Sequence, residues 1–463
     1  MNKTLLIVSA AAAGLVLASG AARADFANVE VYGTLNVDFE NVKATGATPA
    51  GTAIPGCPNG TCQLGGVPTG VTEASRNRVT SNSSNIGFRG KEDLGWGLKA
   101  IFQVESGVNV NSASNTTTTG GNASSGFWAS RNSNVGLSSE KLGTIFYGNW
   151  DTPYKALTNT VTFDSFYGTG IANDNTIIGT PGFGVASSTA DTRVNGAADA
   201  SFDRRQGNSV QYWTPQFFGI SGRLLYSTNQ GRSSEPASVA NPNLNPQIFG
   251  ASVAWQYGPL GVAYAFEQHR DYFGLSQLGG QALGSAALGA TPKSRDNGNK
   301  VTLSYKLDTS LGTTLLNAAW EDLAYNNTES GAASAALATN LIHYDRQMIY
   351  FAGQHKFGAN TLRLGFGDAW GGSCNRAGGP TTPCSTSNLG AKQYSFGYSY
   401  SFSKRTDLYG FYTLITNGDF ANYPLGNGSS ITSTSLAAGG TGGASNGIGA
   451  RQQGIGLGIR HVF

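Results

Sequence analysis

The last ten residues of the chain, GIGLGIRHVF, constrain its fold more than any other stretch of the sequence. In an extended strand, side chains two residues apart lie on the same face. One face here carries Ile455, Leu457, Ile459, His461 and Phe463, and the other carries Gly456, Gly458 and Arg460. This combination of an apolar face with a small or polar face is typical of strands in a transmembrane β-barrel, where one side meets lipid and the other meets water.

The stretch 393–402 shows the same alternation most clearly. Aromatic residues occupy one face and only serine and glycine occupy the other, so that Tyr394, Phe396, Tyr398, Tyr400 and Phe402 alternate with Ser395, Gly397, Ser399 and Ser401. In a soluble sandwich the outer face is polar and the apolar face packs on a second sheet. We therefore interpret the small face as the lining of a wet lumen. A two-residue period also recurs at 98–104, 249–257, 301–307 and 362–366.

The connections between these segments fall into two length classes. Seven are short turns, at 91–97, 138–144, 215–219, 256–261, 306–313, 356–361 and 401–407. They join fourteen strands in pairs, and one further strand at each end makes sixteen. Eight are long loops, at 43–74, 109–127, 153–203, 229–248, 272–295, 326–342, 371–390 and 417–450. This spacing places every long loop on one side of the sheet and every short turn on the other.

The sheet is expected to close on itself. An open edge in hydrocarbon leaves backbone groups unsatisfied at a cost of several kcal/mol each, so the first strand, 29–40, should pair with the last. A barrel of sixteen strands is wide enough to leave an aqueous channel. The prediction is an all-β fold: a 16-stranded antiparallel transmembrane β-barrel with long extracellular loops, short periplasmic turns and a third loop folded inward.

Residues 1–24 have the pattern of a secretory signal. Lys3 precedes an apolar core from Leu5 to about Ala18, and Ala22, Arg23 and Ala24 form an A-x-A cleavage box. We expect removal of 1–24, which leaves 25–463 as the barrel. The apolar core is too short for a spanning helix, and no later stretch approaches the eighteen or so consecutive apolar residues that one needs.

The composition agrees with a membrane barrel. Only 12% of the residues are charged, against about a quarter in soluble domains. The 65 glycines, 19 tyrosines and 23 phenylalanines suit thin-walled strands with aromatic girdles. Without Lys3 and Arg23 the chain holds 28 basic and 27 acidic residues, a balance that gives no support to nucleic-acid binding.

Four cysteines form two local pairs, Cys57 with Cys62 and Cys374 with Cys384. Each pair lies in a segment rich in Gly, Pro and Ser, and the oxidising periplasm favours disulfides there. Four cysteines allow three connectivities, so the nearest-neighbour pairing is a prediction. A metal site is the alternative, although no histidine lies close to either pair.

The loop 153–203 is 51 residues long, far beyond the roughly 12 to 15 residues at which unstructured connections become uncommon. An open pore of this width discriminates poorly between solutes. We therefore expect this loop to fold inward and narrow the pore, rather than to extend from the surface.

Five segments, in order along the chain, resemble the trimeric general porins of Gram-negative outer membranes, particularly the betaproteobacterial group. They are VEVYGTLNVDFE, NIGFRGKEDLGWGLKAIFQVESG, VGLSSEKLGTIFYGNWD, RQGNSVQYWTPQFFG and the closing RHVF. The resemblance implies a passive diffusion channel for small hydrophilic solutes and ions, without enzymatic activity or cofactor. It further implies a homotrimer in outer-membrane lipid and lipopolysaccharide, and recognition of Phe463 by the barrel assembly machinery.

The same resemblance implies an eyelet in which acidic loop residues face wall arginines. Arg205 matches a wall arginine at the start of the sixth strand, and strand parity turns its neighbour Arg204 the other way. Parity also places Arg89, Lys99 and Glu105 inside, whereas Arg78 lies near a loop-side end where facing is ambiguous. The remaining eyelet candidates are the loop residues Asp164, Asp174, Asp191, Asp199 and the opposing Arg193.

Two departures from the family pattern reduce the expected charge of the eyelet. Asn85 and Asn149 stand where many relatives carry arginine, and the loop segment 181–184 lacks the glutamate that enteric relatives place between Pro and Phe. We therefore predict a weak preference for anions, set by a ring of charged side chains at a narrow waist.

Two alternatives remain open at this point. Phe163, Phe166 and Tyr167 could stack a sugar in a substrate-specific channel for sugars or organic acids, although aromatic residues in such a loop more often anchor it to the wall. A barrel enzyme would need a Ser, His and Asp arrangement, and the four scattered histidines, His269, His343, His355 and His461, do not suggest one. Asn173, Asp174 and Asn175 could offer oxygen ligands to Ca²⁺, but they lack the spacing of a dedicated loop.

Overall fold

The structure is a computed structural model. It describes residues 28–53, 68–110, 128–182, 201–228, 232, 237–238, 243–277, 293–329, 341–376, 384–425 and 448–463. The expected signal sequence 1–24 and the expected Cys57–Cys62 pair lie outside the described residues.

A single antiparallel sheet contains all the described strands. Its first half is formed by β1 (Asn28–Thr45), β2 (Glu73–Ser81), β3 (Asn85–Gly95), β4 (Leu98–Gly107), β5 (Ser133–Ser139), β6 (Gly143–Asp151), β7 (Arg205–Trp213), β8 (Ile220–Ser227) and β9 (Gln247–Tyr257). Its second half is formed by β10 (Leu260–Arg270), β11 (Lys293–Thr309), β12 (Gly312–Glu329), β13 (Leu341–Phe357), β14 (Asn360–Ala369), β15 (Ser373–Arg376), β16 (Ala391–Ser401), β17 (Thr406–Asn417) and β18 (Arg451–Val462). Short helical turns η1 (Lys155–Leu157), η2 (Asp174–Thr176) and α1 (Gly274–Gln277) lie in connections.

The eighteen strand segments occupy sixteen positions around the barrel, because two strands are interrupted. Both β2 and β3 pair with β1, and both β14 and β15 pair with β13. The second interruption lies at Gly371 and Gly372, and a Cβ at Gly372 would collide with the Asp345 carbonyl oxygen. The predicted 16-stranded antiparallel barrel is therefore confirmed.

The barrel closes between its first and last strands, as predicted. The register runs from Thr34 opposite Val462 to Thr45 opposite Arg451. Beyond this ladder the Phe463 amide donates to the Gly33 carbonyl at 3.1 Å, and the Gly33 amide donates to the Phe463 carbonyl at 3.2 Å. The Phe463 ring fills the space that a Cβ at Gly33 would need. The terminal aromatic residue therefore packs directly on the first strand where the two strands meet.

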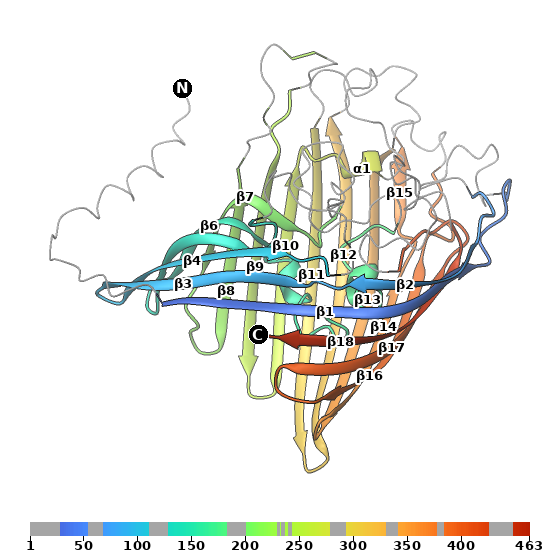
Figure 1. The fold of residues 1–463 in the computed structure, drawn as a ribbon. Helices are drawn as coiled ribbons and strands as arrows, with labels where there is room; N and C mark the ends of the chain where they lie inside the picture. Colours follow the sequence, from blue (N-terminus) through green and yellow to red (C-terminus); the bar gives the residue numbers. More distant parts are fainter. Residues whose placement is uncertain are drawn as a thin grey trace.

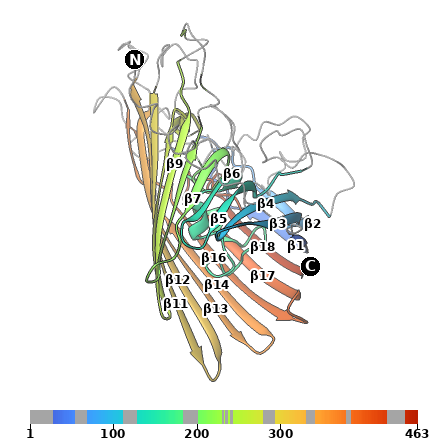
Figure 2. The same ribbon diagram turned by 90° about the vertical axis from the view of Figure 1, so that its left-hand side faces the viewer.

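All seven predicted short turns join the strand pairs expected of them, and the long connections alternate with them. The turns between β9 and β10 and between β11 and β12 lie at the bottom of Figure 1. We call the end of the barrel that carries the short turns the short-turn rim, and the opposite end the long-loop rim. β11–β13 run steeply down the view in both Figure 1 and Figure 2, whereas β1 crosses Figure 1 almost horizontally.

The two faces of the wall differ in the predicted way. Along β16, buried and exposed residues alternate almost without a break. Phe396 is 55% exposed on the outside, whereas Ser399 is 2% exposed on the inside. Aromatic and aliphatic side chains therefore form the outer surface, where the hydrocarbon of a bilayer would solvate them.

No helix among the described residues is long and apolar enough to cross a membrane.

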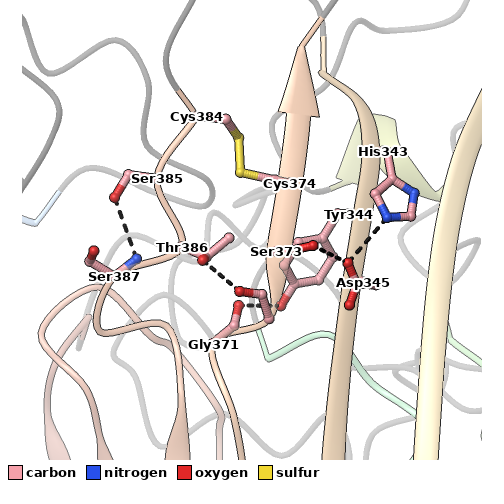
Figure 3. Close-up of a disulfide and its surroundings, with 11 residues drawn as sticks. His343, Tyr344, Asp345, Gly371, Ser373, Cys374, Cys384, Ser385, Thr386 and Ser387 are labelled. Atoms are coloured by element: carbon pink, nitrogen blue, oxygen red, sulfur yellow. Dashed lines mark hydrogen bonds and ion pairs between the residues drawn. A yellow bond between two sulfur atoms is a disulfide. The ribbon is translucent and has the colours of Figure 1, made fainter. Parts of the chain in front are cut away.

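One predicted disulfide is present at the long-loop rim. Cys374 of β15 is bonded to Cys384, with their Cα atoms 5.9 Å apart (Figure 3). The Asp345 carboxylate of the neighbouring strand β13 contacts His343 of the same strand and Ser373 of β15. The bond staples the connection between β15 and β16 to this part of the rim.

Candidate pore constriction

The described residues of the loop 153–203, at 153–182 and 201–203, pack against the inner wall of the barrel, as predicted. Phe163, Phe166, Ile171 and Ile177 are buried in one apolar cluster with inward-facing wall residues, among them Val42, Met348, Tyr350 and Phe411. The aromatic residues Phe163 and Phe166 therefore anchor the loop.

Glycines on the inner wall make room for this packing. A Cβ at Gly367 would lie 2.9 Å from Ile177, and a Cβ at Gly397 would lie 2.7 Å from Phe166. Real Cβ atoms do not approach other heavy atoms so closely. The interpretation of the Ser and Gly face of 393–402 as a wet lumen is thus wrong at Gly397, because the loop covers that position.

A buried charged group fixes the loop to β11, β12 and β13. The Glu321 carboxylate accepts hydrogen bonds from the Tyr154 hydroxyl at 2.8 Å and from the Gly179 amide at 2.9 Å. It also pairs with Arg346 at 3.1 Å and with Lys300 at 3.7 Å. All three side chains are 0% exposed, namely Glu321, Arg346 and Lys300. Water does not reach their charges, so each charge must be stabilised by the others.

The cations of this group also bind loop backbone. Arg346 donates to the carbonyls of Ile177 and Thr180, and Lys300 lies 4.1 Å from the centre of the Tyr154 ring. Uncharged side chains add further contacts. Asn317 donates to the carbonyls of Thr162 and Phe163 at 2.9 Å, and Gln393 donates to that of Asn173 at 2.8 Å. These bonds attach the loop along much of its length.

Three cavities meet at Tyr167, which lines all of them. One of about 230 Å³ is lined by Arg131, Lys155 and Arg205, and one of about 260 Å³ is lined by Glu105, Asp151 and Arg460. The largest of the three, about 520 Å³, is lined by loop residues and by four cations, Lys356, Arg363 and Arg460 of the wall and Lys404 of the turn between β16 and β17. Together they trace a polar path past the loop.

Ion pairs hold several of these charges in place. The Arg205 guanidinium lies 3.4 Å from Asp151 and donates to the Asn132 side-chain oxygen at 2.5 Å. Lys155 lies 3.7 Å from Asp151, and Arg131 lies 2.5 Å from Glu105. Among the described residues, cations outnumber acids by seven to four along the three cavities.

The acidic residues of the loop itself are buried, which changes their ionisation. Burial raises the pKa of Asp164 to about 7. Burial, together with Asp164 and Asp203, raises the pKa of Asp174 well above its ordinary value. Burial also raises the pKa of Asp203, in spite of Lys155 and Lys300 nearby. The loop therefore carries less negative charge at neutral pH than its sequence suggests.

The sequence profile of the Gram-negative porins matches residues 9–419 of the chain. The chain belongs to the Gram-negative porin family. An outer membrane porin protein of Bordetella pertussis is 27% identical over 357 residues, which cover 73% of this chain and 78% of the relative. The major outer membrane protein P.IA of Neisseria meningitidis serogroup C is 27% identical over 338 residues, which cover 66% and 72%.

Solved structures share the fold. The anion-selective porin from Comamonas acidovorans has a TM-score of 0.61 at 20% identity, with 95% of this chain and 100% of that porin covered. OmpT of Vibrio cholerae has a TM-score of 0.53 at 14% identity, with 95% and 98% covered. Membership of the Gram-negative porin family makes the protein an outer-membrane channel and not an enzyme, as predicted.

The structure places three of the expected site residues near the loop of the porin. Arg205 is 5% exposed at the start of β7 and contacts Asp151. Glu105 pairs with Arg131 and accepts a hydrogen bond from the Tyr32 hydroxyl at 3.0 Å. Asp164 is 1% exposed and lies beside two of the cavities.

The other expected residues lie elsewhere in the porin. Arg89 pairs with Glu30, and Lys99 with Glu140, towards the short-turn rim. Arg78 pairs with Glu40, which is 0% exposed. The remaining arginine, Arg204, is buried with its guanidinium over the Tyr272 ring at 5.1 Å. Arg193, Asp191 and Asp199 lie outside the described residues.

Sequence reasoning missed Lys155, Asp151 and Arg460 as pore-lining groups. Strand parity placed Arg460 on the small face of β18, so the sequence did contain a signal for its inward position. Lys155 follows Asp151 by four residues, but the local turn that brings them together is irregular.

The described residues contain no group of three or more His, Cys, Asp or Glu that could hold a metal ion.

We predict that Gly367→Leu displaces the loop and widens the pore of this porin. The larger side chain would occupy the space of Ile177, so the loop must move while the strand pairing of β14 is kept. Single-channel conductance should rise, and larger polyethylene glycols should enter the pore. Gly410→Leu is the matched control, since Gly410 lies on the outer face with its nearest neighbours at 3.6 and 3.8 Å. Equal conductance in the two variants would contradict the prediction.

We predict that Glu321→Gln weakens the attachment of the loop. The change leaves Lys300 and Arg346 buried without their carboxylate, and loss of one partner from a buried ion pair costs about 3–5 kcal/mol. The temperature at which the folded band disappears on unheated gels should fall, and open-channel current noise should rise. Glu140→Gln removes an exposed partner of Lys99 and should change neither quantity. An unaltered melting temperature for Glu321→Gln would refute the anchoring role.

Proposed function

We propose that this porin is a passive diffusion channel for small hydrophilic solutes and ions with a weak preference for anions. The observation that carries the proposal is the excess of cations along the three cavities around Tyr167. Fixed charges at a narrow waist bias ions by sign while admitting hydrated solutes of either sign. The raised pKa of Asp164 adds to this bias, because a protonated carboxyl does not repel an anion.

The preference is weak because several of the charges near Tyr167 are paired with a charge of opposite sign. Arg205 and Lys155 face Asp151, and Arg131 faces Glu105, so their fields partly cancel at the distance of a passing ion. The porin from Comamonas acidovorans, which has a similar fold, is anion-selective. That likeness agrees with the sign of selectivity proposed here.

We propose in addition that residues 1–24 are a signal sequence, that 25–463 form the barrel, and that 153–203 form its constriction. The protein would assemble as a homotrimer in outer-membrane lipid and lipopolysaccharide. Phe463, 38% exposed at the end of the closing strand, would remain available to the barrel assembly machinery. The outward apolar surface supports membrane insertion, and both ends of the barrel chain lie towards the short-turn rim.

A channel specific for a sugar or an organic acid is the second candidate. Three aromatic residues of the loop, Phe163, Phe166 and Tyr167, first suggested such a channel. Phe163 and Phe166 are only 4% and 1% exposed, so they are too buried to stack a solute. Tyr167 alone among them lines all three cavities.

Planar-bilayer recording of the purified protein tests the proposed function. Stepwise conductance, in groups of three for a trimer, and a reversal potential that favours chloride slightly over potassium are the expected results. Strong cation preference would overturn the anion assignment. Absence of conductance from a folded, heat-modifiable barrel would overturn the channel itself.

We predict that Arg205→Glu reverses the ion preference. The substitution replaces the cation that faces Asp151 by a carboxylate on the lining of the 230 Å³ cavity, so the local field beside Asp151 should become negative. The permeability ratio of chloride to potassium should fall from above one to below one. Arg89→Glu makes the same charge change at a position where both Arg89 and its partner Glu30 are more than half exposed, and solvent screening should keep its effect smaller. A ratio that responds equally to both variants would exclude a special role for Arg205.

We predict that acid strengthens the anion preference through Asp164. Its pKa is raised to about 7 by burial, so the carboxylate is mostly ionised at pH 8 and mostly neutral at pH 5.5. The sign follows directly, because protonation removes a negative charge beside the pore. The chloride-to-potassium ratio should rise between pH 8 and pH 5.5, and Asp164→Asn should hold the higher ratio at both values. A full pH response in Asp164→Asn would assign the titration to another group.

A further inference from the structure

An aromatic cluster lines the inner wall away from the residues that anchor the loop. Phe146 and Trp150 of β6 and Trp213 of β7 meet edge to face, with ring centres 5.1, 5.3 and 5.8 Å apart. Sequence patterns alone did not single out these residues. None of them belongs to the apolar cluster that holds Phe163 and Phe166.

The strand register places the cluster inside the barrel. Phe146 lies opposite Gly136 on one side and Gln211 on the other, and a Cβ at Gly136 would collide with Phe146. The alternate residues of β6 point outward, where Ile145 is 41% exposed and Tyr147 is 61% exposed. Two tryptophans on the inner face of a wet barrel are unexpected, since tryptophan usually serves such barrels in the outer girdles.

The cluster forms one side of a cavity of about 450 Å³, distinct from the three cavities around Tyr167. Its other lining residues include Gln103 and Asn134 and the ion pair of Arg89 with Glu30. Both oxygens of Glu30 accept from Arg89 at 2.8 Å, so the pair is fixed at one edge. Gln103 uses its amide nitrogen to reach the Asn132 carbonyl at 2.8 Å. Aromatic walls with a few placed polar groups are the usual composition of small-molecule sites.

We propose that this cavity is a subsite for a neutral pyranose sugar in transit through the pore. A pyranose ring presents C–H groups on its faces, which pack on indole rings, and hydroxyls at its edge, which both donate and accept. The edge of the cavity can bind such hydroxyls, because it carries the carboxamides of Gln103 and Asn134 and the ion pair of Arg89 with Glu30. The proposal rests on the proposed diffusion function and adds a solute class to it.

Other solutes fit the cavity less well. An organic anion would meet the Glu30 carboxylate at the edge where it would seek Arg89. An apolar aromatic compound would desolvate Gln103 and Asn134 without giving them hydrogen-bond partners. Trp150 is the ring available for stacking, since the Arg223 guanidinium already lies 4.4 Å from the centre of the Trp213 ring.

Titration of single channels with maltose tests the proposal on the full-length porin. Added maltose should produce a saturable block of the potassium chloride current in the unaltered protein. Trp150→Ala should raise the apparent dissociation constant about two- to tenfold, the range expected for loss of one ring contact. Gln103→Leu, which removes a polar group of the edge, should also weaken the block and serves if Trp150→Ala does not fold.

The matched control is Trp255→Ala. Trp255 is 40% exposed on the outer face, stacked on Tyr257 at 5.6 Å, so its loss should leave the maltose titration unchanged. Salt conductance without saturable maltose block, or block that is insensitive to Trp150 and Gln103, would overturn the subsite and leave the channel intact. Stronger Trp150-dependent block by benzoate than by maltose would also overturn the sugar assignment, in favour of an aromatic anion. Loss of salt conductance itself would contradict the underlying channel function.

Discussion

The pairing of β1 with β18 is the constraint on which the rest of this porin depends. Hydrocarbon offers no hydrogen bonds to an open edge, so the sheet must close, and closure with sixteen strand positions encloses more space than wall side chains can fill. The backbone bonds between Gly33 and Phe463 complete that closure at the short-turn rim. The wide interior then creates the need for a second element inside it. The loop 153–203 is that element, and its position follows from the space that the closed barrel leaves.

The loop is held by interactions that would be unfavourable on an outer surface. Glu321, Lys300 and Arg346 lose all contact with solvent, and their attraction offsets this loss only because the carboxylate also accepts from Tyr154 and Gly179. Apolar packing into the spaces beside Gly367 and Gly397 supplies the rest. Such an arrangement favours one loop position, since all three charged side chains contact loop groups in that position. The part of the inner wall that the loop covers is thereby dry, and the polar path runs past Tyr167 instead.

Sequence periodicity was enough to predict the barrel, because each strand and turn is a local feature. The seven turns, the pairing of first and last strands and the Cys374–Cys384 bond all follow from neighbours in the chain or from the need to close the sheet. The site was harder to predict from the sequence, because its contacts join residues that lie far apart in the chain. Strand parity turned Arg205 inward, where it contacts Asp151, but it could not show that Arg204 is buried beside Tyr272, because both residues of that contact lie outside the strands. A face of Ser and Gly is equally compatible with water or with a packed loop. Gly397 packs against Phe166 of the loop, whereas Ser399 lines the 520 Å³ cavity, and the sequence of the strand does not reveal this difference.

Discrimination in this porin can arise at two places that act on different properties of a solute. Around Tyr167 the field comes from an excess of cations, several of which are paired with carboxylates, so it separates ions by sign and has little effect on a neutral molecule. The wall of Phe146, Trp150 and Trp213 acts through ring contact and hydrogen bonding, to which a small inorganic ion is insensitive. Because the two surfaces use different forces, a substitution at one need not disturb the other. The channel can therefore remain general for salt while retaining one class of neutral solute slightly longer.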